Sequence, residues 1–206
     1  MSTFRFAIMG AGNIAHQFCD AVTLVEDCEV SAIASKDLGR AQKFAEECSV
    51  AHAYDNYEQM LIEEKPDCVY IAVTPNDHFR LTMLCLEHRV PVLCEKAMFT
   101  NSAEAKAVFE KAEKDQTFVM EAMWSRFLPA VNQAKKWAAE GKIGRLEALQ
   151  GRIGFLAPEG ADNRYHSPLL CGGAATDITV YAYEIATWLV NEPVRKTYAA
   201  ANLDQT

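Results

Sequence analysis

Glu95 and Lys96 directly follow Val90–Cys94, a run of apolar and β-branched residues that is typical of a buried strand. A charged pair beside a packed sheet costs free energy unless it has partners or a chemical task. Asp177 and Tyr181 are four apart in a later helical pattern, so we expect them to share one face of a helix. A tyrosine, with an ordinary pKa of about 10, becomes a useful base only where a cation such as a lysine ammonium favours its phenolate.

Residues 10–15 read GAGNIA and follow the first expected strand, which gives the pattern G-x-G-x-x-A. The first glycine permits a tight turn, and the second lets the backbone approach a pyrophosphate. The start of the next helix offers N–H groups and a positive dipole end to the phosphates. The pattern predicts a dinucleotide site, and a glycine-rich turn without a ligand is the alternative. The expected contacts come from Gly10, Gly12, Asn13 and Ile14.

The residues after the second expected strand bear on the choice of nicotinamide cofactor. An acidic side chain there would accept the ribose hydroxyls of NAD. This sequence has Ser35 in that position, with Lys36 and Arg40 close by. A hydroxyl and two cations suit a 2′-phosphate, so the sequence favours NADP. NAD stays open, because both cations are also typical of a solvated surface and Asp37 could reach a ribose hydroxyl.

Thr74, Pro75 and Asn76 follow the long apolar run Cys68–Val73. In a doubly wound sheet, ligands bind outside the carboxyl ends of the strands. These three residues are therefore expected to contact the cofactor. For His78, a packing role beside the cofactor and a position without a chemical role both stay open.

Strand and helix patterns alternate over residues 1–121, which predicts an α/β fold with a doubly wound parallel sheet, a Rossmann domain. The expected strands are 4–9, 30–34, 51–54, 68–73, 90–94 and 118–120. Helical patterns lie between them, and 38–48 is an example. A capping box at Asn101 and Glu104 predicts the start of another helix.

The pattern changes in residues 122–206, which we expect to form a second domain. A helix is expected to end at Gly141, and another to span about 173–190. Residues 145–156 alternate like a strand with one exposed face, and 194–203 could be another strand. Two strands do not make an independent sheet. The fold prediction is therefore the start of an α/β domain with an antiparallel or mixed sheet that is incomplete.

The composition bears on partners and location. The chain has 206 residues and a formal charge of −8, which argues against nucleic acid or an anionic membrane as the main partner. No apolar run approaches the ~20 residues that a membrane span needs, and the N-terminus shows no signal-peptide pattern. The seven cysteines form no CxxC pair, which favours reduced thiols in the cytoplasm. The scattered histidines predict no metal site.

Five motifs occur in an informative order: the G-x-G-x-x-A turn, TPNDH (74–78), EK (95–96), MEAMWSRF (120–127) and GGAATDITVY (172–181). Together they resemble the glucose–fructose oxidoreductase / inositol dehydrogenase (Gfo/Idh/MocA) family, and most closely its dimeric dihydrodiol dehydrogenase branch. The resemblance implies a Rossmann domain followed by an α/β domain with a large open antiparallel sheet. It also implies a longer chain, whose C-terminal part is missing here, and a homodimer formed through that sheet.

Two positions depart from the family pattern. The family has Glu-Lys-Pro where this chain has Ala97 after the lysine, and it has a glycine where this chain has Thr179. Losing the proline removes a fixed φ and restores a backbone donor. The residues expected to do chemistry match the family, while two neighbours that shape the backbone do not.

The resemblance implies an oxidoreductase in which a secondary alcohol loses a hydride to the nicotinamide and a proton to a base. Lys96 matches the family's catalytic lysine. Tyr181 could accept and return the proton, Lys96 could lower its pKa, and Asp177 could orient the substrate or the lysine. Glu95 is expected to brace the site at its cofactor side. Substrate contacts are expected from Trp124, Arg126 and Arg164.

The predicted function is an NAD(P)-dependent oxidoreductase, with NADP favoured, that acts on a carbinol of a small-molecule sugar, polyol or dihydrodiol. The alternative is a catalytically inactive or truncated relative that binds the nucleotide as a sensor or regulator. Ala97, Thr179 and the early end of the chain favour that alternative. At the level of single residues, Glu95 and Lys96 could also be a structural ion pair.

Overall fold

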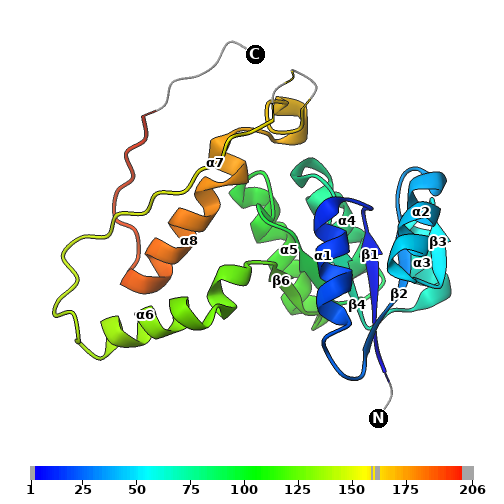
Figure 1. The fold of residues 1–206 in the computed structure, drawn as a ribbon, viewed down its shortest axis with the longest axis horizontal. Coiled ribbons are helices and arrows are strands. Elements are labelled where there is room, and N and C mark those ends of the chain that lie inside the picture. The colour runs from blue at the N-terminus through cyan, green and yellow to red at the C-terminus, as the bar shows by residue number, and fades with distance from the viewer. Residues whose placement is uncertain (1–2, 159, 161–162, 201–206) are drawn as a thin grey trace. The chain divides into compact units, whose positions relative to one another are not determined.

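The computed structural model describes residues 3–158, 160 and 163–200. The chain forms two compact units, Met1–Ala122 and Met123–Thr206, each of which is described by itself (Figure 1). Within the described residues, no helix combines the length and the apolar character that a membrane crossing requires.

The first unit is built on one parallel sheet. Its strands are β1 (Phe4–Met9), β2 (Cys28–Ala34), β3 (His52–Tyr54), β4 (Cys68–Ile71), β5 (Val92–Cys94) and β6 (Val119–Glu121). They lie in the order β3-β2-β1-β4-β5-β6, and every pair is parallel. The order reverses between β1 and β4, which is the switch point of a doubly wound fold. The α/β class and the Rossmann sheet are therefore confirmed.

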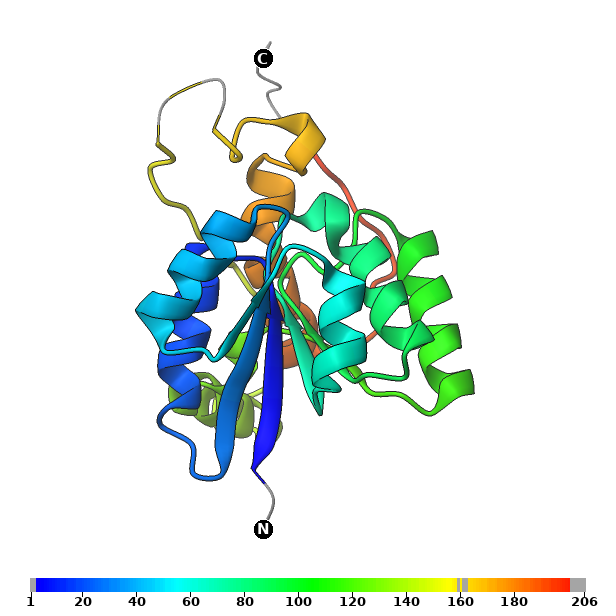
Figure 2. The ribbon, with the colours of Figure 1, turned by 90° about the vertical axis from the view of Figure 1, so that its right-hand side faces the viewer.

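Helices cover both faces of this sheet (Figure 2). They are α1 (Asn13–Val22), α2 (Leu38–Cys48), α3 (Tyr57–Glu64), α4 (Pro75–Glu87) and α5 (Ser102–Asp115). Residues of α1 and α2, such as Cys19 and Phe44, pack on one face of the sheet against Ile8 and Ile33. The helices α3 and α4 pack on the other face, and α5 packs against α4.

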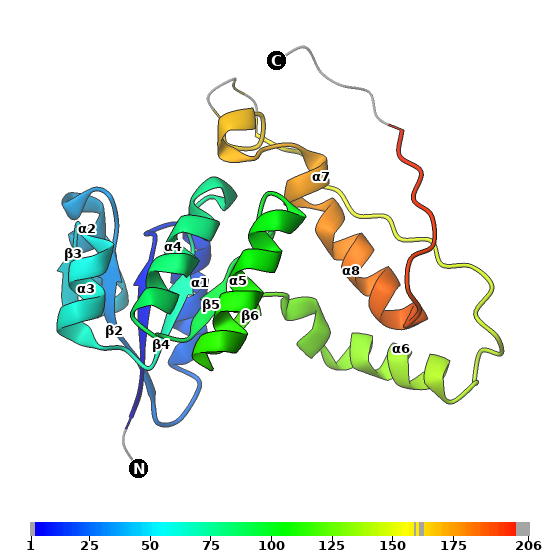
Figure 3. The same cartoon turned by 180° about the vertical axis from the view of Figure 1, so that it is seen from behind.

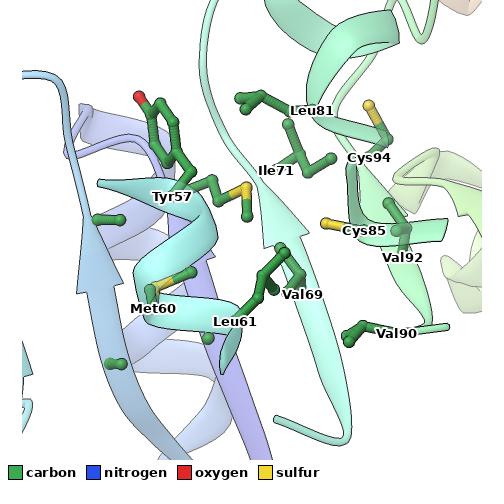
Figure 4. Packing of buried hydrophobic residues seen from close by; sticks show 14 of the residues in the cluster. Tyr57, Met60, Leu61, Val69, Ile71, Leu81, Cys85, Val90, Val92 and Cys94 are labelled. Atoms are coloured by element: carbon green, nitrogen blue, oxygen red, sulfur yellow. The ribbon is translucent and has the colours of Figure 1, made fainter. Parts of the chain in front are cut away.

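The core under α3 and α4 fixes the carboxyl ends of the central strands. Tyr57, Met60 and Leu61 of α3 and Leu81 and Cys85 of α4 converge on apolar side chains of β4 and β5 (Figure 4). All four residues of β4 are buried, as expected of a strand covered on both faces. The turns that follow β4 and β5 are therefore anchored by packing.

Side-chain caps fix where several helices begin. The Oδ1 atoms of Asp37 and Asn56 accept from backbone N–H groups three residues later. Asn101 caps α5 by accepting from the N–H groups of Ala103 and Glu104. Glu104 accepts from the N–H of Thr100, one residue before the position that an ideal capping box requires.

The second unit consists of short helical elements and extended segments in its described part. The elements are η1 (Trp124–Phe127), α6 (Pro129–Ala139), η2 (Pro168–Leu170), α7 (Ala174–Asp177) and α8 (Thr179–Val190) (Figure 3). The helix predicted over about 173–190 is formed as two helices, because the backbone of Ile178 leaves the helical region at φ −126° and separates α7 from α8. Thr179 Oγ1 donates to the carbonyl of Ala174 across this break at 2.9 Å.

The expected strands of the second unit are not formed in its described residues. Residues 145–156 run without strand pairing, and so do 194–200, while 201–203 lie outside the described residues. An alternating pattern predicts which side chains face a core, but a strand also needs a neighbour that accepts its backbone hydrogen bonds. No such neighbour occurs in the described part of this unit. The segment Leu149–Ile153 lies beside α8 instead.

Candidate functional site

The glycine-rich turn after β1 has a geometry that only glycine fits at its first position. Gly10 has φ +108°, and a Cβ built on it would lie 2.7 Å from the carbonyl oxygen of Ala72. The N–H of Gly10 donates to the carbonyl of Ala34 at 2.8 Å, which holds the turn against β2. A side chain here would strain the backbone and meet another strand's backbone. The turn thus lies close to the backbone of Ala72 at the sheet's carboxyl edge.

The helix α1 begins directly after this turn. Gly12 is its N-cap residue, and no side chain of the described residues caps it. Asn13 and Ile14, the first helical residues, are exposed. An uncapped helix start with a positive dipole end is a ready binding site for phosphate. Gly10, Gly12, Asn13 and Ile14 are therefore close together in one turn, as a pyrophosphate site requires.

The residues after β2 lie beside the glycine-rich turn that follows β1. Ser35 is 5% exposed, and its N–H donates to the carbonyl of Tyr54 at 3.0 Å. The guanidinium of Arg40 reaches back to the glycine turn, where Nη2 donates to the carbonyl of Ala11 at 3.3 Å. A cation and a hydroxyl therefore lie beside the expected position of the ribose, without a carboxylate at position 35.

Lys36 is bound to a residue of the next strand–helix turn. Its Nζ donates to Oδ2 of Asp77 at 2.5 Å, and Arg80 pairs with Oδ1 of the same carboxylate. Burial opposes ionisation of Asp77, but the two cations outweigh it and hold the pKa of Asp77 below its ordinary value. Lys36 therefore ties the turn after β2 to the start of α4.

The start of α4 lies at the same edge of the sheet. Thr74 is the N-cap residue and Pro75 the first helical residue, where its fixed φ fits and its missing N–H costs nothing. Asn76 is exposed in the first turn. All three residues thus lie at the start of α4, after the carboxyl end of β4.

His78 is fully buried and braces two turns against each other. Its Nε2 lies 3.0 Å from the carbonyl of Val73, and its Nδ1 lies 3.0 and 3.1 Å from the carbonyls of Ala97 and Met98. Burial lowers its pKa and favours the neutral ring, despite these acceptors. The imidazole therefore connects the end of β4 to the turn that carries Lys96.

Glu95 accepts hydrogen bonds from a phenol and from a backbone amide. The Oη of Tyr70 donates to Oε1 of Glu95 at 2.5 Å, and Oε2 accepts from the N–H of Lys96 at 3.2 Å. Burial raises the pKa of Glu95. Lys96 is half-buried, and the peptide bond between Lys96 and Ala97 is cis. This carboxyl group shapes the turn that presents the lysine.

In the second unit the structure brings Asp177 close to a cation. Nη1 of Arg164 lies 3.2 Å from Oδ1 of Asp177, and its guanidinium carbon lies 4.0 Å from the centroid of the Tyr165 ring. Asp177 ends α7, and Tyr181 lies in the first turn of α8. The expectation that one helix face carries both residues is corrected by the break at Ile178 between them.

The other two expected substrate residues contact α8. Trp124 Nε1 donates to Oη of Tyr181 at 3.1 Å. Arg126 Nε donates to Oε1 of Glu184, and Ser125 Oγ donates to Oε2 of the same carboxylate at 3.0 Å. Lys96 and the residues predicted to contact the cofactor belong to the first unit, whereas Asp177, Tyr181 and Trp124 belong to the second.

Sequence reasoning missed two polar groups that shape these surroundings. Tyr70 looked like one more apolar strand residue, and its bond to Glu95 gave no signal in the sequence. Glu184 did give one, because it is the only charged residue in the apolar helix α8. Among the described residues, no group of three or more His, Cys, Asp or Glu side chains is arranged to hold a metal ion.

Comparisons with known proteins agree with this geometry. Residues 4–123 match the model of the "Oxidoreductase family, NAD-binding Rossmann fold", and residues 131–206 match the "GFO/IDH/MocA C-terminal domain". A solved NAD-binding protein from Listeria innocua superposes with a TM-score of 0.82 over 92% of this chain and 56% of that one. At 22% identity this likeness shows the shared fold.

Two curated relatives are similar over most of this chain. Trans-1,2-dihydrobenzene-1,2-diol dehydrogenase of Mus musculus is 32% identical over 190 residues, which are 90% of this chain and 56% of the mouse protein. The protein of the same name from Sus scrofa is 34% identical over 185 residues, which are 87% of this chain and 54% of the pig protein. The chain thus spans about half the length of the curated relatives that it matches.

Proposed function

The chain belongs to the Gfo/Idh/MocA oxidoreductase family, and on that basis we propose that it binds a nicotinamide dinucleotide and oxidises or reduces a small molecule at a carbinol or carbonyl carbon. The proposed division is a cofactor domain, residues 1–121, and a substrate domain, residues 122–206. The observation that carries the proposal is the turn at Gly10, where a Cβ would meet the backbone of Ala72. A pyrophosphate needs such a close backbone approach.

The preferred cofactor in this proposal is NADP, with NAD as the second choice. Ser35 and Arg40 favour it, because the guanidinium bonded to the carbonyl of Ala11 lies beside the phosphate-binding turn. Lys36 forms an ion pair with Asp77, so its charge is already partly neutralised and attracts a 2′-phosphate less strongly. Arg40 is therefore the main determinant of the proposed preference for NADP. Further contacts with the cofactor are proposed from the turn after β4 and the start of α4, at Thr74, Pro75, Asn76 and His78.

The nicotinamide, when bound, supplies hydride transfer, and the chain's own groups manage the proton. Tyr181 is the proposed proton acceptor and donor for the substrate hydroxyl. Lys96 is proposed to favour its phenolate and to bond the ribose or the substrate. Asp177 orients the substrate hydroxyl, and Arg164 holds its carboxylate in place. Glu95 holds the turn of Lys96 through its bond from Tyr70.

The proposed substrate class is a sugar, polyol or dihydrodiol, and the similar relatives are named for a dihydrodiol. Trp124 is 62% exposed and offers an aromatic face to a ring-shaped substrate. Arg126 is engaged by Glu184, so we give it a positioning role beside its proposed substrate contact. We also propose a homodimer formed through the second domain, because apolar side chains such as Phe155 and Leu156 are exposed in a segment whose sequence pattern is that of a strand.

A nucleotide-binding protein without turnover is the second candidate. It is favoured by Ala97 and Thr179, the two departures from the family pattern, and by the break at Ile178 near the second. This candidate would retain the cofactor site and lack a competent proton-transfer group.

Turnover of the whole protein separates the two candidates. The experiment follows nicotinamide absorbance with a panel of sugars, polyols and a trans-dihydrodiol. The proposal expects turnover with a member of this panel and a loss of about a hundredfold or more in kcat for Lys96→Met and for Tyr181→Phe. Ser102→Ala, at an exposed position at the start of α5 that has no role in the proposal, is the control and keeps the rate. Equal turnover in all variants would remove the residue assignment, and cofactor binding without any turnover would favour the second candidate.

A further inference from the structure

Tyr181 accepts a hydrogen bond from a residue outside the proposed proton-transfer groups. The donor is the indole Nε1–H of Trp124, at 3.1 Å from Oη. An indole nitrogen donates and does not accept, so the phenolic oxygen is the acceptor in this contact. A hydrogen bond to an ionised acceptor is shorter and stronger than one to a neutral acceptor. The contact therefore favours the phenolate of Tyr181 over the phenol.

The indole is not held in this position by burial, because Trp124 is 62% exposed. Its neighbour in the chain supplies the restraint. Ser125 is buried, and its Oγ donates to Oε2 of Glu184 at 3.0 Å. Arg126 donates to the other oxygen of the same carboxylate. Glu184 thus binds two consecutive residues of η1 and fixes the segment that presents the indole.

Glu184 is well suited to be such an anchor. It is the only buried residue of α8, and it lies three residues after Tyr181, hence on the same helix face. Burying a carboxylate is costly unless its oxygens are paired, and both are. One turn further along, the guanidinium of Arg126 lies 5.6 Å from the centroid of the Trp188 ring. Successive residues of η1 therefore contact successive turns of α8.

We propose that Trp124 is a positioning residue that tunes the proton affinity of Tyr181, and that Glu184 holds it in place through Ser125 and Arg126. The inference rests on the proposed function, because it assigns a donor to the proposed proton-transfer tyrosine. The hydrogen bond itself does not depend on turnover, so the two are tested separately. Charged groups near Tyr181 among the described residues of its own unit include Asp177 with Arg164, Glu184 with Arg126, and Arg152 on the segment beside α8.

The direct test is the titration of Tyr181 in this chain. The seven tyrosines are labelled with ¹³C at Cζ, and the signal of Tyr181 is identified by its absence in Tyr181→Phe. Trp124→Phe keeps an aromatic ring and removes the donor. The expected result is an upward shift of the Tyr181 midpoint by about one pH unit, the worth of one hydrogen bond to a charged group.

Two further variants separate the donor from the ring. Trp124→His places its Nε2 where the indole nitrogen was and retains a donor at alkaline pH. Its Tyr181 midpoint is therefore expected to lie close to that of the wild type. Trp137→Phe, on α6, is the control and leaves the midpoint unchanged. Glu184→Ala releases η1 and is expected to shift the midpoint upward as Trp124→Phe does. Glu184→Gln, which keeps both hydrogen bonds possible, is expected to shift it less.

An unchanged midpoint in folded Trp124→Phe would overturn the proposal. If that variant does not fold, Glu184→Ala decides in its place, and an unchanged midpoint there would overturn the proposal equally. Full turnover by Tyr181→Phe would refute the proposed proton-transfer role of Tyr181. It would not affect a shift of the Tyr181 midpoint measured in Trp124→Phe. If the Tyr181 midpoint shifts in Trp124→Phe while Tyr181→Phe keeps full turnover, the proposed function has failed and the hydrogen-bond proposal has not.

Discussion

The two units hold their functional residues by different means. In the first, α4 buries five residues, of which Leu81 and Cys85 pack against the parallel sheet, and the site residues follow directly from packed strands. In the second, α8 buries only Glu184, and polar contacts from η1 hold the helix face that carries Tyr181. The first unit is stabilised mainly by apolar burial, whereas the second depends on a few specific hydrogen bonds. The comparison predicts that similar mutations will have very different effects in the two units.

The largest difference is expected from truncating one aliphatic side chain in each helix. Leu81→Ala in α4 removes a fully buried side chain and should reduce the free energy of unfolding of the first unit by about 3 kcal/mol. Ile185→Ala in α8 removes a half-buried one and should cost the second unit about 1 kcal/mol. Hydrogen exchange resolved by peptide measures both units in one experiment. Equal losses would contradict the comparison.

The glycine turn provides the second test. Gly10→Ala places a methyl group 2.7 Å from the carbonyl oxygen of Ala72 at φ +108°, so we expect cofactor affinity to fall by about a hundredfold or more. Gly141→Ala is the matched control, because Gly141 also has a positive φ, of +70°, but its Cβ would meet nothing within 4 Å. That variant should bind the cofactor normally. Titration of the bound nucleotide's fluorescence measures both, and normal binding by Gly10→Ala would refute a close backbone approach.

The smallest expected effect is a pH dependence from His78. Burial lowers its pKa in the folded state below the value of about 6.5 in the unfolded chain. As the pH falls below that value, the unfolded chain takes up a proton here before the folded one does. The free energy of unfolding therefore falls, by at most about 1.4 kcal/mol per pH unit, until the lower folded pKa is reached.

Comparing the wild type with His78→Gln at about pH 7 and about pH 5.5 isolates this contribution. The wild type should lose more stability between the two conditions than the variant. An identical loss in both proteins would mean that His78 is not held neutral between the carbonyls of Val73 and Ala97.

The sequence predicted the first unit well, for physical reasons that did not extend to the second. The strand Phe4–Met9 and the helix Leu38–Cys48 have the predicted bounds, because their apolar periods are regular and Asp37 caps the helix. The break at Ile178 was missed because Ile-Thr-Val continues an apolar helical pattern. The strands expected at 145–156 and 194–203 were wrong for the described residues, because alternation does not supply a hydrogen-bonding neighbour.

The candidate site divides in the same way. The residues that line the cofactor side follow from motif positions on known strand ends, so a sequence could name Gly10, Ser35 and Lys96. The contact between Trp124 and Tyr181 joins residues 57 positions apart, and no local sequence pattern predicts it. The brace from His78 likewise depends on backbone carbonyls from a distant turn. The roles given to all of these residues stay predictions.

The most direct test of the central claim is a titration of this chain with NADPH and with NADH, followed by nucleotide fluorescence. We expect saturable binding of NADPH, with NADH at least about tenfold weaker because Arg40 and Ser35 favour a 2′-phosphate. Arg40→Met should remove most of that difference while leaving the affinity for NADH unchanged. Binding of neither nucleotide would contradict the claim that the turn at Gly10 is a dinucleotide site.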